Sequence, residues 1–322
     1  MDFQAIRSLV IEDLEQTNTL IHTHLDSHVA VIKEIGHYIV DAGGKRSRAI
    51  LALLSSRVCG LPQPKAALFS AIIELLHAAT LLHDDVVDGS ELRRGKPSAN
   101  MIYDNSASVL AGDFLYSRTF EMMVELNNMD LLKRLAIATN TLAEGEMLQL
   151  QNCHKCDITE ADYLKVIDCK TATLFTVAAE IPALLNSAPE PIQQALENYG
   201  HSLGIAFQLV DDVIDYTSNE ATMGKSQGDD LAEGKITLPL IYAKANGTTE
   251  DRKVIDEAIL HGDATALPKI LEIIQRTDST NQVLNKAQFF VNQAKSALAI
   301  LPESRYTTAL AHFADLAVSR SA

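Results

Sequence analysis

Residues 65–94 read KAALFSAIIELLHAATLLHDDVVDGSELRR, and this stretch decides the class of fold. Its first part, residues 65–83, is apolar around most of a helix, which predicts a helix buried in a core rather than one lying on a surface. The stretch then changes to three aspartates and two adjacent arginines. Acidic side chains at the C-terminal end of a helix are disfavoured by the helix dipole, so this cluster points to a role in binding.

Helical patterns continue along the rest of the chain. Residues 106–126 and 130–151 have the same largely apolar character as residues 65–83. No segment shows the sustained alternation of apolar and polar residues that is typical of a strand. We therefore expect an all-α fold, a helical bundle in which residues 1–322 form a single domain.

Helix start signals predict two further helices in the second half. Thr159 and Asp162 resemble a capping box, which predicts a helix that runs through Leu185. Pro189 suits the first turn of the next helix, which we expect to continue to about Tyr216.

Composition excludes several classes of protein. The net charge of −15 argues against a nucleic acid partner, whose phosphates select basic surfaces. The N-terminal sequence MDFQAIRSLVIEDLEQ carries acidic residues early and lacks a long apolar core. It therefore argues against a signal peptide or transmembrane segment and predicts a cytoplasmic protein. Cys153 and Cys156 have a zinc-like spacing, but no second pair accompanies them, so free thiols are favoured over a zinc site.

Residues 207–215, FQLVDDVID, contain a second acidic cluster with the same spacing as the first. The two clusters consist of Asp84, Asp85 and Asp88, and of Asp211, Asp212 and Asp215. Residues four apart share one face of a helix, so the outer aspartates of each cluster project together. Facing carboxylates repel unless a cation lies between them, and Mg²⁺ prefers carboxylate and phosphate oxygens. Two acidic helix ends in solvent are the alternative, but the repeated spacing favours a magnesium site.

Basic residues stand beside glycines or acidic clusters at three places. AGGKRSR, residues 42–48, puts two glycines before three cations at an expected helix start, where backbone N–H groups and the helix dipole bind anions. An ordinary basic first turn is the alternative for this segment taken alone. The segments 89–98 and 219–235 are candidate functional loops, and their cations are Arg93, Arg94, Lys225 and Lys235. Such cations beside carboxylate clusters suggest two diphosphate-bearing substrates.

The chain resembles the trans-prenyltransferases, the head-to-tail polyprenyl diphosphate synthases, over nearly its whole length. The resemblance rests on ordered motifs, which are GGKRSR, ELLHAATLLHDDVVDGSELRRGKPSAN, GDFLYSRTF, the KT at 170–171, FQLVDDVID and GKSQGDDLAEGKITLPL. In detail it is most similar to the bacterial octaprenyl diphosphate synthases. The resemblance implies the isoprenoid-synthase fold, in which antiparallel helices surround a deep central cavity, and usually a homodimer.

The implied activity is the Mg²⁺-dependent condensation of isopentenyl diphosphate with an allylic diphosphate, for which farnesyl diphosphate is the expected primer. The implied product is octaprenyl diphosphate (about C40) for the side chain of a quinone such as ubiquinone. This lipophilic product would pass to the membrane. Heptaprenyl (C35) and nonaprenyl (C45) diphosphates are the alternative products.

The resemblance also implies roles for individual side chains. Two or three Mg²⁺ ions would bind at the six aspartates, directly at Asp84, Asp88 and Asp211, with support from Asp85, Asp212 and Asp215. The isopentenyl diphosphate site would comprise Lys45, Arg48, His77 and Arg94. The allylic diphosphate site would comprise Arg93, Lys170, Thr171, Gln208, Lys225 and Lys235. Catalysis itself would involve Asp84, Asp88, Asp211, Lys170 and Lys225.

Some of these residues have plain structural alternatives. His77 taken alone would be a core histidine, although it lies two turns before the first acidic cluster on the same helix. Lys170 sits in an apolar segment and needs a partner, which a diphosphate would supply. Gln208 could be an ordinary hydrogen-bonding residue of the core. Ala49 and Ile236 stand where the family usually has proline, so we expect an effect on the stiffness of these loops.

Product length should depend on the helix that precedes Asp84, because the growing chain must run along it. Ala79 and Thr80 lie one turn before Asp84 and are small, which favours a long product. Met122 and Met123 are candidates for the floor of the channel, although methionine is also common core filler.

Three rival functions have weaker support. A helical di-iron protein would use Glu34 with His37 and Glu74 with His77, but it leaves both acidic clusters and all the basic motifs without a role. A terpene cyclase would not need GGKRSR or a second full acidic cluster. A non-catalytic partner subunit should have lost aspartates from one cluster, and both clusters are intact.

Overall fold

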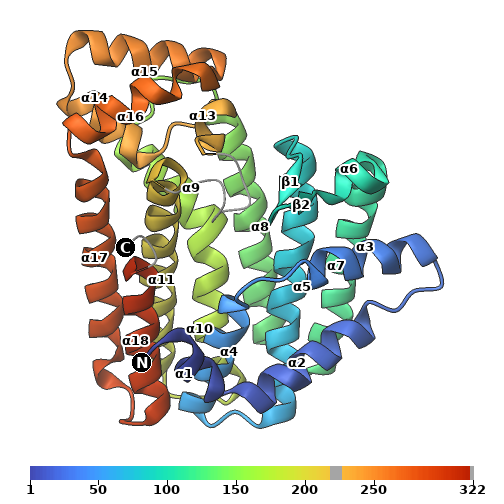
Figure 1. Cartoon of the computed structure of the whole chain (residues 1–322). Coiled ribbons are helices and arrows are strands. Elements are labelled where there is room, and N and C mark those ends of the chain that lie inside the picture. The colour runs from blue at the N-terminus through green and yellow to red at the C-terminus, as the bar shows by residue number, and fades with distance from the viewer. Residues whose placement is uncertain (218–226, 320–322) are drawn as a thin grey trace. The chain divides into compact units, whose positions relative to one another are not determined.

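The computed structural model describes residues 1–217 and 227–319, and helices dominate both stretches (Figure 1). The prediction of an all-α fold is confirmed. By packing, the chain divides into two compact units, and four of the five divisions fall inside long helices. The single domain expected over residues 1–322 and its central cavity stay predictions.

Unit 1 comprises residues 1–136, 177–197 and 298–313. Its complete elements are α1 (Phe3–Ser8), α2 (Ile11–His24), α3 (Ala30–Asp41), α4 (Ser47–Cys59), α5 (Gln63–Val87), β1 (Leu92–Arg93), β2 (Lys96–Pro97), α6 (Ala99–Tyr103), α7 (Asn105–Glu125) and η3 (Leu298–Ile300). It also holds the first part of α8 (Met129–Asn152), the first part of α11 (Glu190–Thr217), and most of α10 (Thr173–Leu185) and α18 (Arg305–Val318).

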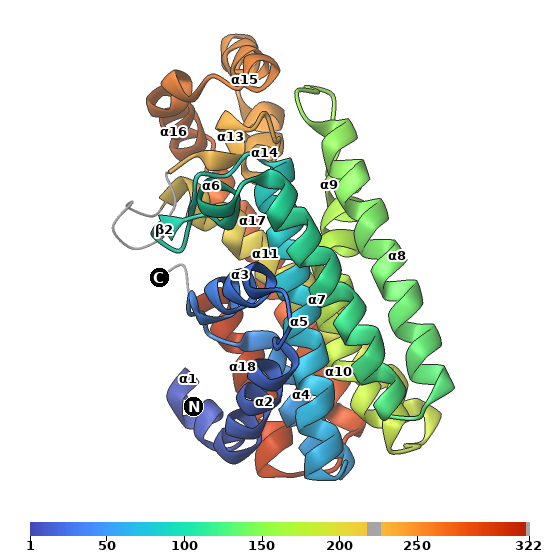
Figure 2. The ribbon, with the colours of Figure 1, turned by 90° about the vertical axis from the view of Figure 1, so that its right-hand side faces the viewer.

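Helix α5 forms the core of unit 1 and packs against α2, α4 and α7. Figure 2 shows α7 alongside α5. His83 in the penultimate turn of α5 lies 3.2 Å from the carbonyl oxygen of Val109 near the start of α7, so the two helices run antiparallel. A Cβ atom on Gly112 would lie 2.4 Å from the His83 ring, so glycine permits this close approach. By length and composition α5 could cross a membrane, but 72% of its apolar window is buried inside the protein, as the sequence predicted for a core helix.

Unit 2 comprises residues 137–176, 198–297 and those from 314 onward. Its complete elements are α9 (Glu160–Ile167), η1 (Asp168–Ala172), α13 (Asp229–Ala232), α14 (Leu238–Asn246), α15 (Thr249–His261), η2 (Ala264–Ala266), α16 (Leu267–Arg276) and α17 (Ser279–Ala297). It also holds the remaining parts of α8, α10, α11 and α18.

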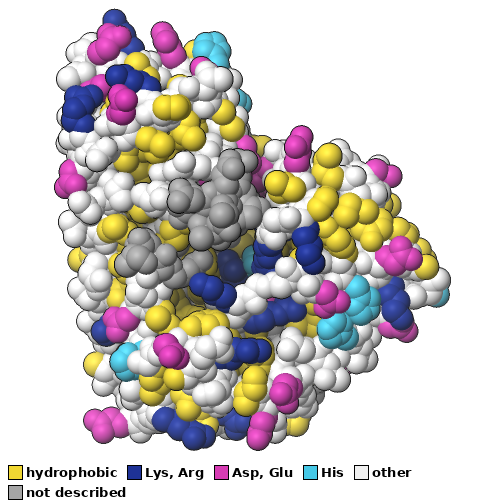
Figure 3. Space-filling model, viewed as in Figure 1, with side chains coloured by type: hydrophobic (Ala, Val, Ile, Leu, Met, Phe, Trp, Pro, Cys, Tyr) yellow, Lys and Arg dark blue, Asp and Glu magenta, His cyan; other side chains and the backbone are white. Residues whose placement is uncertain are grey.

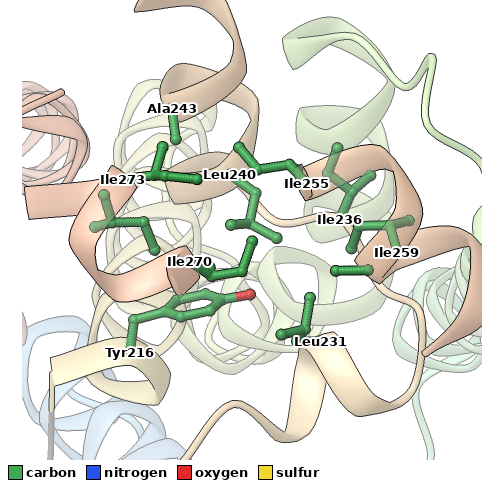
Figure 4. Packing of buried hydrophobic residues seen from close by; sticks show 11 residues of the cluster. Tyr216, Leu231, Ile236, Leu240, Ala243, Ile255, Ile259, Ile270 and Ile273 are labelled. Carbon is green, nitrogen blue, oxygen red and sulfur yellow. The ribbon is translucent and has the colours of Figure 1, made fainter. Parts of the chain in front are cut away.

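A hydrophobic cluster in unit 2 holds Leu231 of α13 and Ile236 (Figure 4). Ile236 stands where the family usually has proline, and its side chain is buried in this cluster. Side-chain packing therefore holds Ile236 in place, where the sequence alone indicated only a change in the stiffness of the chain. The labelled members of the cluster are Tyr216, Leu231, Ile236, Leu240, Ala243, Ile255, Ile259, Ile270 and Ile273.

The expected helix boundaries agree closely with the structure, but the short helix α13 lies inside the segment 219–235 that was expected to be a loop. The capping box is confirmed, since Thr159 accepts a hydrogen bond from the backbone N–H of Asp162, whose carboxylate accepts one from Thr159 in return. The helix expected to run on through Leu185 is instead interrupted at residues 168–172 by η1, which is a π-helix. The loop expected at residues 89–98 contains the two-residue strands β1 and β2, paired antiparallel.

Candidate active site

The GGKRSR segment of unit 1 forms a tight turn before α4. Gly43 and Gly44 have φ angles of +91° and +126°, which side chains other than glycine rarely adopt. A Cβ atom on Gly44 would lie 2.7 Å from the guanidinium group of Arg94, so glycine lets the β1–β2 hairpin approach this turn. Arg46, immediately before α4, and Arg94 also have positive φ angles, of 53° and 54°. The local backbone therefore brings cations from two separate segments together.

Four arginines of unit 1 lie close enough to His77 to shift its pKa. One guanidinium nitrogen of Arg48 lies 3.2 Å from Nε2 of His77. Burial lowers the pKa of His77 well below its usual value, and the positive charges of Arg48, Arg94, Arg93 and Arg46 lower it further. Burial also lowers the pKa of Arg94, as do the charges of Arg93 and Arg46. Crowded cations around a neutral imidazole form a site suited to an anion with several charges.

Glu74 partly balances this positive charge. Its carboxylate accepts a hydrogen bond of 3.0 Å from Arg46 and one of 2.9 Å from the backbone N–H of Ala49. Proline, which the family usually has in place of Ala49, carries no N–H and could not make this second bond. Because Glu74 is engaged in this way and His77 faces arginines, the Glu74–His77 pair is unsuited to iron. Lys45 lies exposed beside the same turn.

The first acidic cluster contains one buried and two partly exposed aspartates. Asp84 and Asp85 lie in the last turn of α5, and Asp88 caps that helix. Asp85 is fully buried and accepts hydrogen bonds from Arg93, including two of 2.7 and 2.9 Å from its Nε. Asp84 and Asp88 are partly exposed. Arg93, expected at the allylic diphosphate, therefore has a carboxylate partner within its own chain.

The second acidic cluster, in unit 2, contains two buried aspartates and one exposed aspartate. Asp212 is buried, and it accepts hydrogen bonds of 2.5 Å from the Tyr163 hydroxyl and 2.7 Å from the Gln208 side-chain amide. Asp215 is also buried, whereas Asp211 is exposed. Tyr163 was not identified from the sequence, where its place in an apolar helical pattern gave no signal.

Two further aspartates of unit 2 influence this cluster. Burial raises the pKa of Asp215 to about 8, and the negative charges of Asp230 and Asp229 raise it too. Burial and the charge of Asp230 likewise raise the pKa of Asp212 well above its usual value. Asp229 and Asp230 were not predicted as site residues, although the GDD sequence at residues 228–230 indicates a further group of carboxylates. Oxygen ligands under such mutual repulsion fit a hard divalent cation such as Mg²⁺.

Lys170 finds partners on α8 without any diphosphate. Its ammonium nitrogen lies 2.7 Å from a carboxylate oxygen of Glu146 and 2.7 Å from the amide oxygen of Gln149. The adjacent Thr171 donates a hydrogen bond of 2.8 Å to the amide oxygen of Gln208. Gln208 therefore links Thr171 to Asp212, and it acts as more than an isolated core hydrogen-bonding residue.

The π-helix η1 positions Lys170 and Thr171, and two glycines permit its close packing. A Cβ atom on Gly145 of α8 would lie 2.8 Å from the backbone nitrogen of Lys170. A Cβ atom on Gly204 of α11 would lie 2.6 Å from Cα of Ala172. Single π-helical turns occur frequently at functional sites. The sequence gave no sign of this turn, because its composition matches that of an ordinary helix.

The remaining expected residues have mixed outcomes. Lys235 is largely buried, and its ammonium nitrogen lies 2.5 Å from the Glu233 carboxylate. Lys225 lies outside the described residues. None of the four cysteines forms a disulfide. The thiols of Cys153 and Cys156 donate to backbone carbonyl groups.

The chain-length candidates lie on the two antiparallel helices of unit 1. On α5, Ala79 is 1% exposed and Thr80 is partly exposed. Thr80 belongs to a partly exposed stripe on an otherwise buried helix, formed with His77, Asp84 and Asp88. Met122 and Met123 of α7 are fully buried. Their roles in setting product length stay predictions.

The chain is similar to known proteins over most or all of its length. The family model described as polyprenyl synthetase matches residues 29–275. The octaprenyl diphosphate synthase of Haemophilus influenzae is 42% identical over 100% of this chain and 98% of its own length. The geranyl-diphosphate-specific all-trans-nonaprenyl-diphosphate synthase of Rhodobacter capsulatus is 44% identical over 99% of each chain. A crystal structure of a polyprenyl synthase from Caulobacter crescentus, complexed with calcium and isoprenyl diphosphate, has a TM-score of 0.96 and 40% identity, covering 100% of this chain and 98% of that one.

Proposed function

Because the chain belongs to the polyprenyl synthetase family and is therefore a trans-prenyltransferase, we propose that it makes octaprenyl diphosphate from farnesyl and isopentenyl diphosphates. The observation that carries the proposal is the group of four arginines around neutral His77, which suits a diphosphate. The full-length similarity to octaprenyl diphosphate synthases supports the product length. The ubiquinone pathway and a cytoplasmic location belong to the same proposal.

The basic cluster of unit 1 would bind isopentenyl diphosphate. Arg48 and Arg94 can each direct several N–H groups at phosphate oxygens, and Lys45 adds a further positive charge. Neutral His77 can donate one hydrogen bond, and it adds no positive charge that would repel the arginines. This arrangement would hold the diphosphate end and leave the double bond of the substrate exposed to the allylic partner.

The acidic clusters and a second set of cations would bind the allylic diphosphate. Asp84, Asp88 and Asp211 would hold Mg²⁺, and Asp85 and Asp212 would be kept in place by the hydrogen bonds of their own chain. Bound Mg²⁺ would supply electrostatic stabilisation of the departing diphosphate. Six further side chains would contact this substrate, namely Arg93, Lys170, Thr171, Gln208, Lys225 and Lys235.

The reaction would then proceed by ionisation, condensation and elimination. The carbon–oxygen bond to the allylic diphosphate breaks, and the double bond of isopentenyl diphosphate attacks the resulting carbocation. Loss of a proton, which the released diphosphate accepts, restores a double bond and gives a chain longer by one unit. Side chains that hold both substrates must also exclude water, because water would capture the cation.

The assembly proposed is a homodimer. Figure 3 shows hydrophobic side chains gathered over α6, and large apolar side chains on α6 and α7 are exposed. Met101 is 57% exposed, Leu110 63% and Val124 65%. A second copy of the chain would cover these helices. Sedimentation equilibrium should give twice the mass of the chain, and Leu110→Glu should shift the protein toward the monomer.

Nonaprenyl diphosphate is the second candidate product, because the Rhodobacter capsulatus nonaprenyl synthase is equally similar. The experiment is product analysis with farnesyl diphosphate, labelled isopentenyl diphosphate and Mg²⁺, followed by dephosphorylation and chromatographic sizing. A dominant octaprenyl alcohol supports the proposal. A dominant nonaprenyl or heptaprenyl alcohol corrects the length only, and a cyclic hydrocarbon rejects the synthase activity.

A further inference from the structure

We propose that His22, His37 and Asp41 form a binding site for a divalent transition metal ion of the zinc class, separate from the magnesium site. The three residues belong to unit 1, where His22 lies in the last turn of α2 and His37 and Asp41 lie at the end of α3. Figure 3 shows histidine side chains gathered where α2 and α3 meet. Neither the acidic clusters nor the basic cluster includes any of these residues.

The ligand atoms of this site already lie close together. One nitrogen of each imidazole and one carboxylate oxygen all lie within 4.8 Å of one another. Nε2 of His22 and Nδ1 of His37 each lie 3.5 Å from a carboxylate oxygen of Asp41. The two imidazole rings are stacked, with centroids 5.2 Å apart and Nδ1 atoms 3.3 Å apart.

These separations match those between ligands on one metal ion. Zinc binds imidazole nitrogen and carboxylate oxygen at about 2.0–2.1 Å, so tetrahedral ligand atoms are roughly 3.3–3.5 Å apart. The 3.5 Å distances from His22 and His37 to the carboxylate of Asp41 fall in this range. One ligand atom from each of the three residues lies within 4.8 Å of the others, so side-chain rotation would bring all three onto one ion. Three protein ligands leave a fourth position for water, which suits side chains that are partly exposed.

The donor set also selects the class of metal. Imidazole nitrogen suits Zn²⁺, Cu²⁺, Ni²⁺ and Co²⁺, whereas Mg²⁺ prefers oxygen ligands. Helices α2 and α3 both present their C-terminal turns to the site, and the negative ends of helix dipoles favour a cation. The nearby ammonium group of Lys33 is paired with Asp26 at 2.9 Å, which reduces its opposition to a bound ion.

A metal ion here would join α2 to the end of α3, directly before the GGKRSR turn. His37 and Asp41 share one face of α3, being four residues apart. Tyr38, next to His37, donates a hydrogen bond of 2.5 Å to the carbonyl oxygen of Pro97 in β2. A metal ion that restrains α3 would therefore also restrain the hairpin that carries Arg93 and Arg94.

The test is Zn²⁺ binding by isothermal titration calorimetry in excess Mg²⁺, which occupies the acidic clusters. The full chain carries Cys153→Ser and Cys156→Ser, which removes the pair of thiols with zinc-like spacing. We expect one equivalent of Zn²⁺ to bind and to raise the unfolding temperature by mass action. Because loss of a supporting residue alone weakens metal binding 10–100-fold, His22→Asn and His37→Asn should each weaken it by at least about tenfold.

The matched control is His28→Asn, which removes an exposed histidine between α2 and α3 and should leave the affinity unchanged. Cu²⁺ bound to the parent protein should show nitrogen hyperfine coupling in its electron paramagnetic resonance spectrum, and His37→Asn should reduce that coupling. Absence of stoichiometric Zn²⁺ binding by the parent protein would overturn the proposal. So would full affinity in both His22→Asn and His37→Asn, or an equal loss in the control. Since none of these readouts involves turnover, the result is independent of the proposed function.

Discussion

The hydroxyl group of Tyr163 donates a hydrogen bond of 2.5 Å to Oδ2 of Asp212, joining α9 to α11. In unit 1, Arg93 of β1 binds the fully buried carboxylate of Asp85 at the end of α5. The second aspartate of each acidic cluster is thus buried and held by a side chain from another element. This burial supports the proposal that the more exposed aspartates of each cluster bind the metal directly.

Substitution of single aspartates should separate these two roles. Asp84→Asn and Asp211→Asn should each lower kcat by at least ~10³, the scale of losing a main electrostatic stabiliser, with little change in stability. Asp85→Asn should lower the free energy of unfolding by about 3–5 kcal/mol, because it leaves the Arg93 charge without its buried partner. Steady-state kinetics at saturating Mg²⁺ and denaturant titration check both. Near-native turnover of Asp84→Asn or Asp211→Asn would contradict the assignment.

Tyr163→Phe should weaken the second cluster through Asp212. The change removes one donor from a buried carboxylate and should lower the free energy of unfolding by about 1–3 kcal/mol. It should also raise the Mg²⁺ concentration needed for half-maximal activity, because Asp212 no longer has a fixed orientation. Tyr103→Phe in unit 1, outside this network, is the control. Unchanged stability and unchanged Mg²⁺ dependence would show that the Tyr163 hydroxyl has no positioning role.

Glu146 should compete with the allylic diphosphate for Lys170. Lys170→Ala should raise KM for farnesyl diphosphate about tenfold or more, since charge-assisted hydrogen bonds contribute roughly 1.5–3 kcal/mol. Glu146→Gln should lower the same KM several-fold, because Lys170 would no longer have to break an ion pair with Glu146 before it binds the diphosphate. Glu144→Gln, an exposed change on the same helix, is the control. A KM for farnesyl diphosphate that rises in Glu146→Gln would mean that Glu146 positions Lys170 for the substrate.

Product length should change when a larger side chain is placed on α5 or a smaller one on α7. A ring at Ala79→Tyr would block the channel about one helical turn from Asp84, so products should shorten to about three or four isoprene units. Met123→Ala should lengthen the products if Met123 forms the floor. Val124→Ala, an exposed change beside it, is the control. Chromatographic sizing of the products tests all three variants. A full-length product from Ala79→Tyr would show that the growing isoprenoid chain runs elsewhere.

His77 should make the stability of the protein depend on pH. Its pKa in the folded state lies well below the ordinary value of about 6.5, so the unfolded chain takes up the proton first as the pH falls. The stability due to neutral His77 is therefore present above about pH 6.5 and is lost below it. Unfolding free energies measured from about pH 5 to 8 should fall more steeply on acidification for the parent than for His77→Gln. Parallel curves would mean that His77 titrates normally.

Periodicity and composition predicted the helices well, because apolar faces and caps are local signals. The capping box at Thr159 and the core helix α5 were both visible in this way. The π-helix η1 was not, since it depends on close packing permitted by Gly145 and Gly204 from distant segments. The need for glycine there appears only when three helices are brought together.

The candidate site was predicted in part for the same reason. Repeated spacing identified the acidic clusters, and the structure places a guanidinium nitrogen of Arg48 3.2 Å from Nε2 of His77. The assignment of these two residues to isopentenyl diphosphate stays a prediction. The partners within the chain were missed, because Glu146 lies far in sequence from Lys170, and Tyr163 from Asp212. A sequence motif shows which charges are present, but it does not show which of them neutralise one another.

The measurement that tests the central claim most directly is the release of diphosphate, counted against isopentenyl units incorporated. Purified protein would be given farnesyl diphosphate and Mg²⁺, with and without labelled isopentenyl diphosphate. The account predicts one diphosphate released for each isopentenyl unit joined to the chain, and negligible release when isopentenyl diphosphate is absent. Sustained release from farnesyl diphosphate alone would contradict chain elongation and indicate a cyclase or a hydrolase.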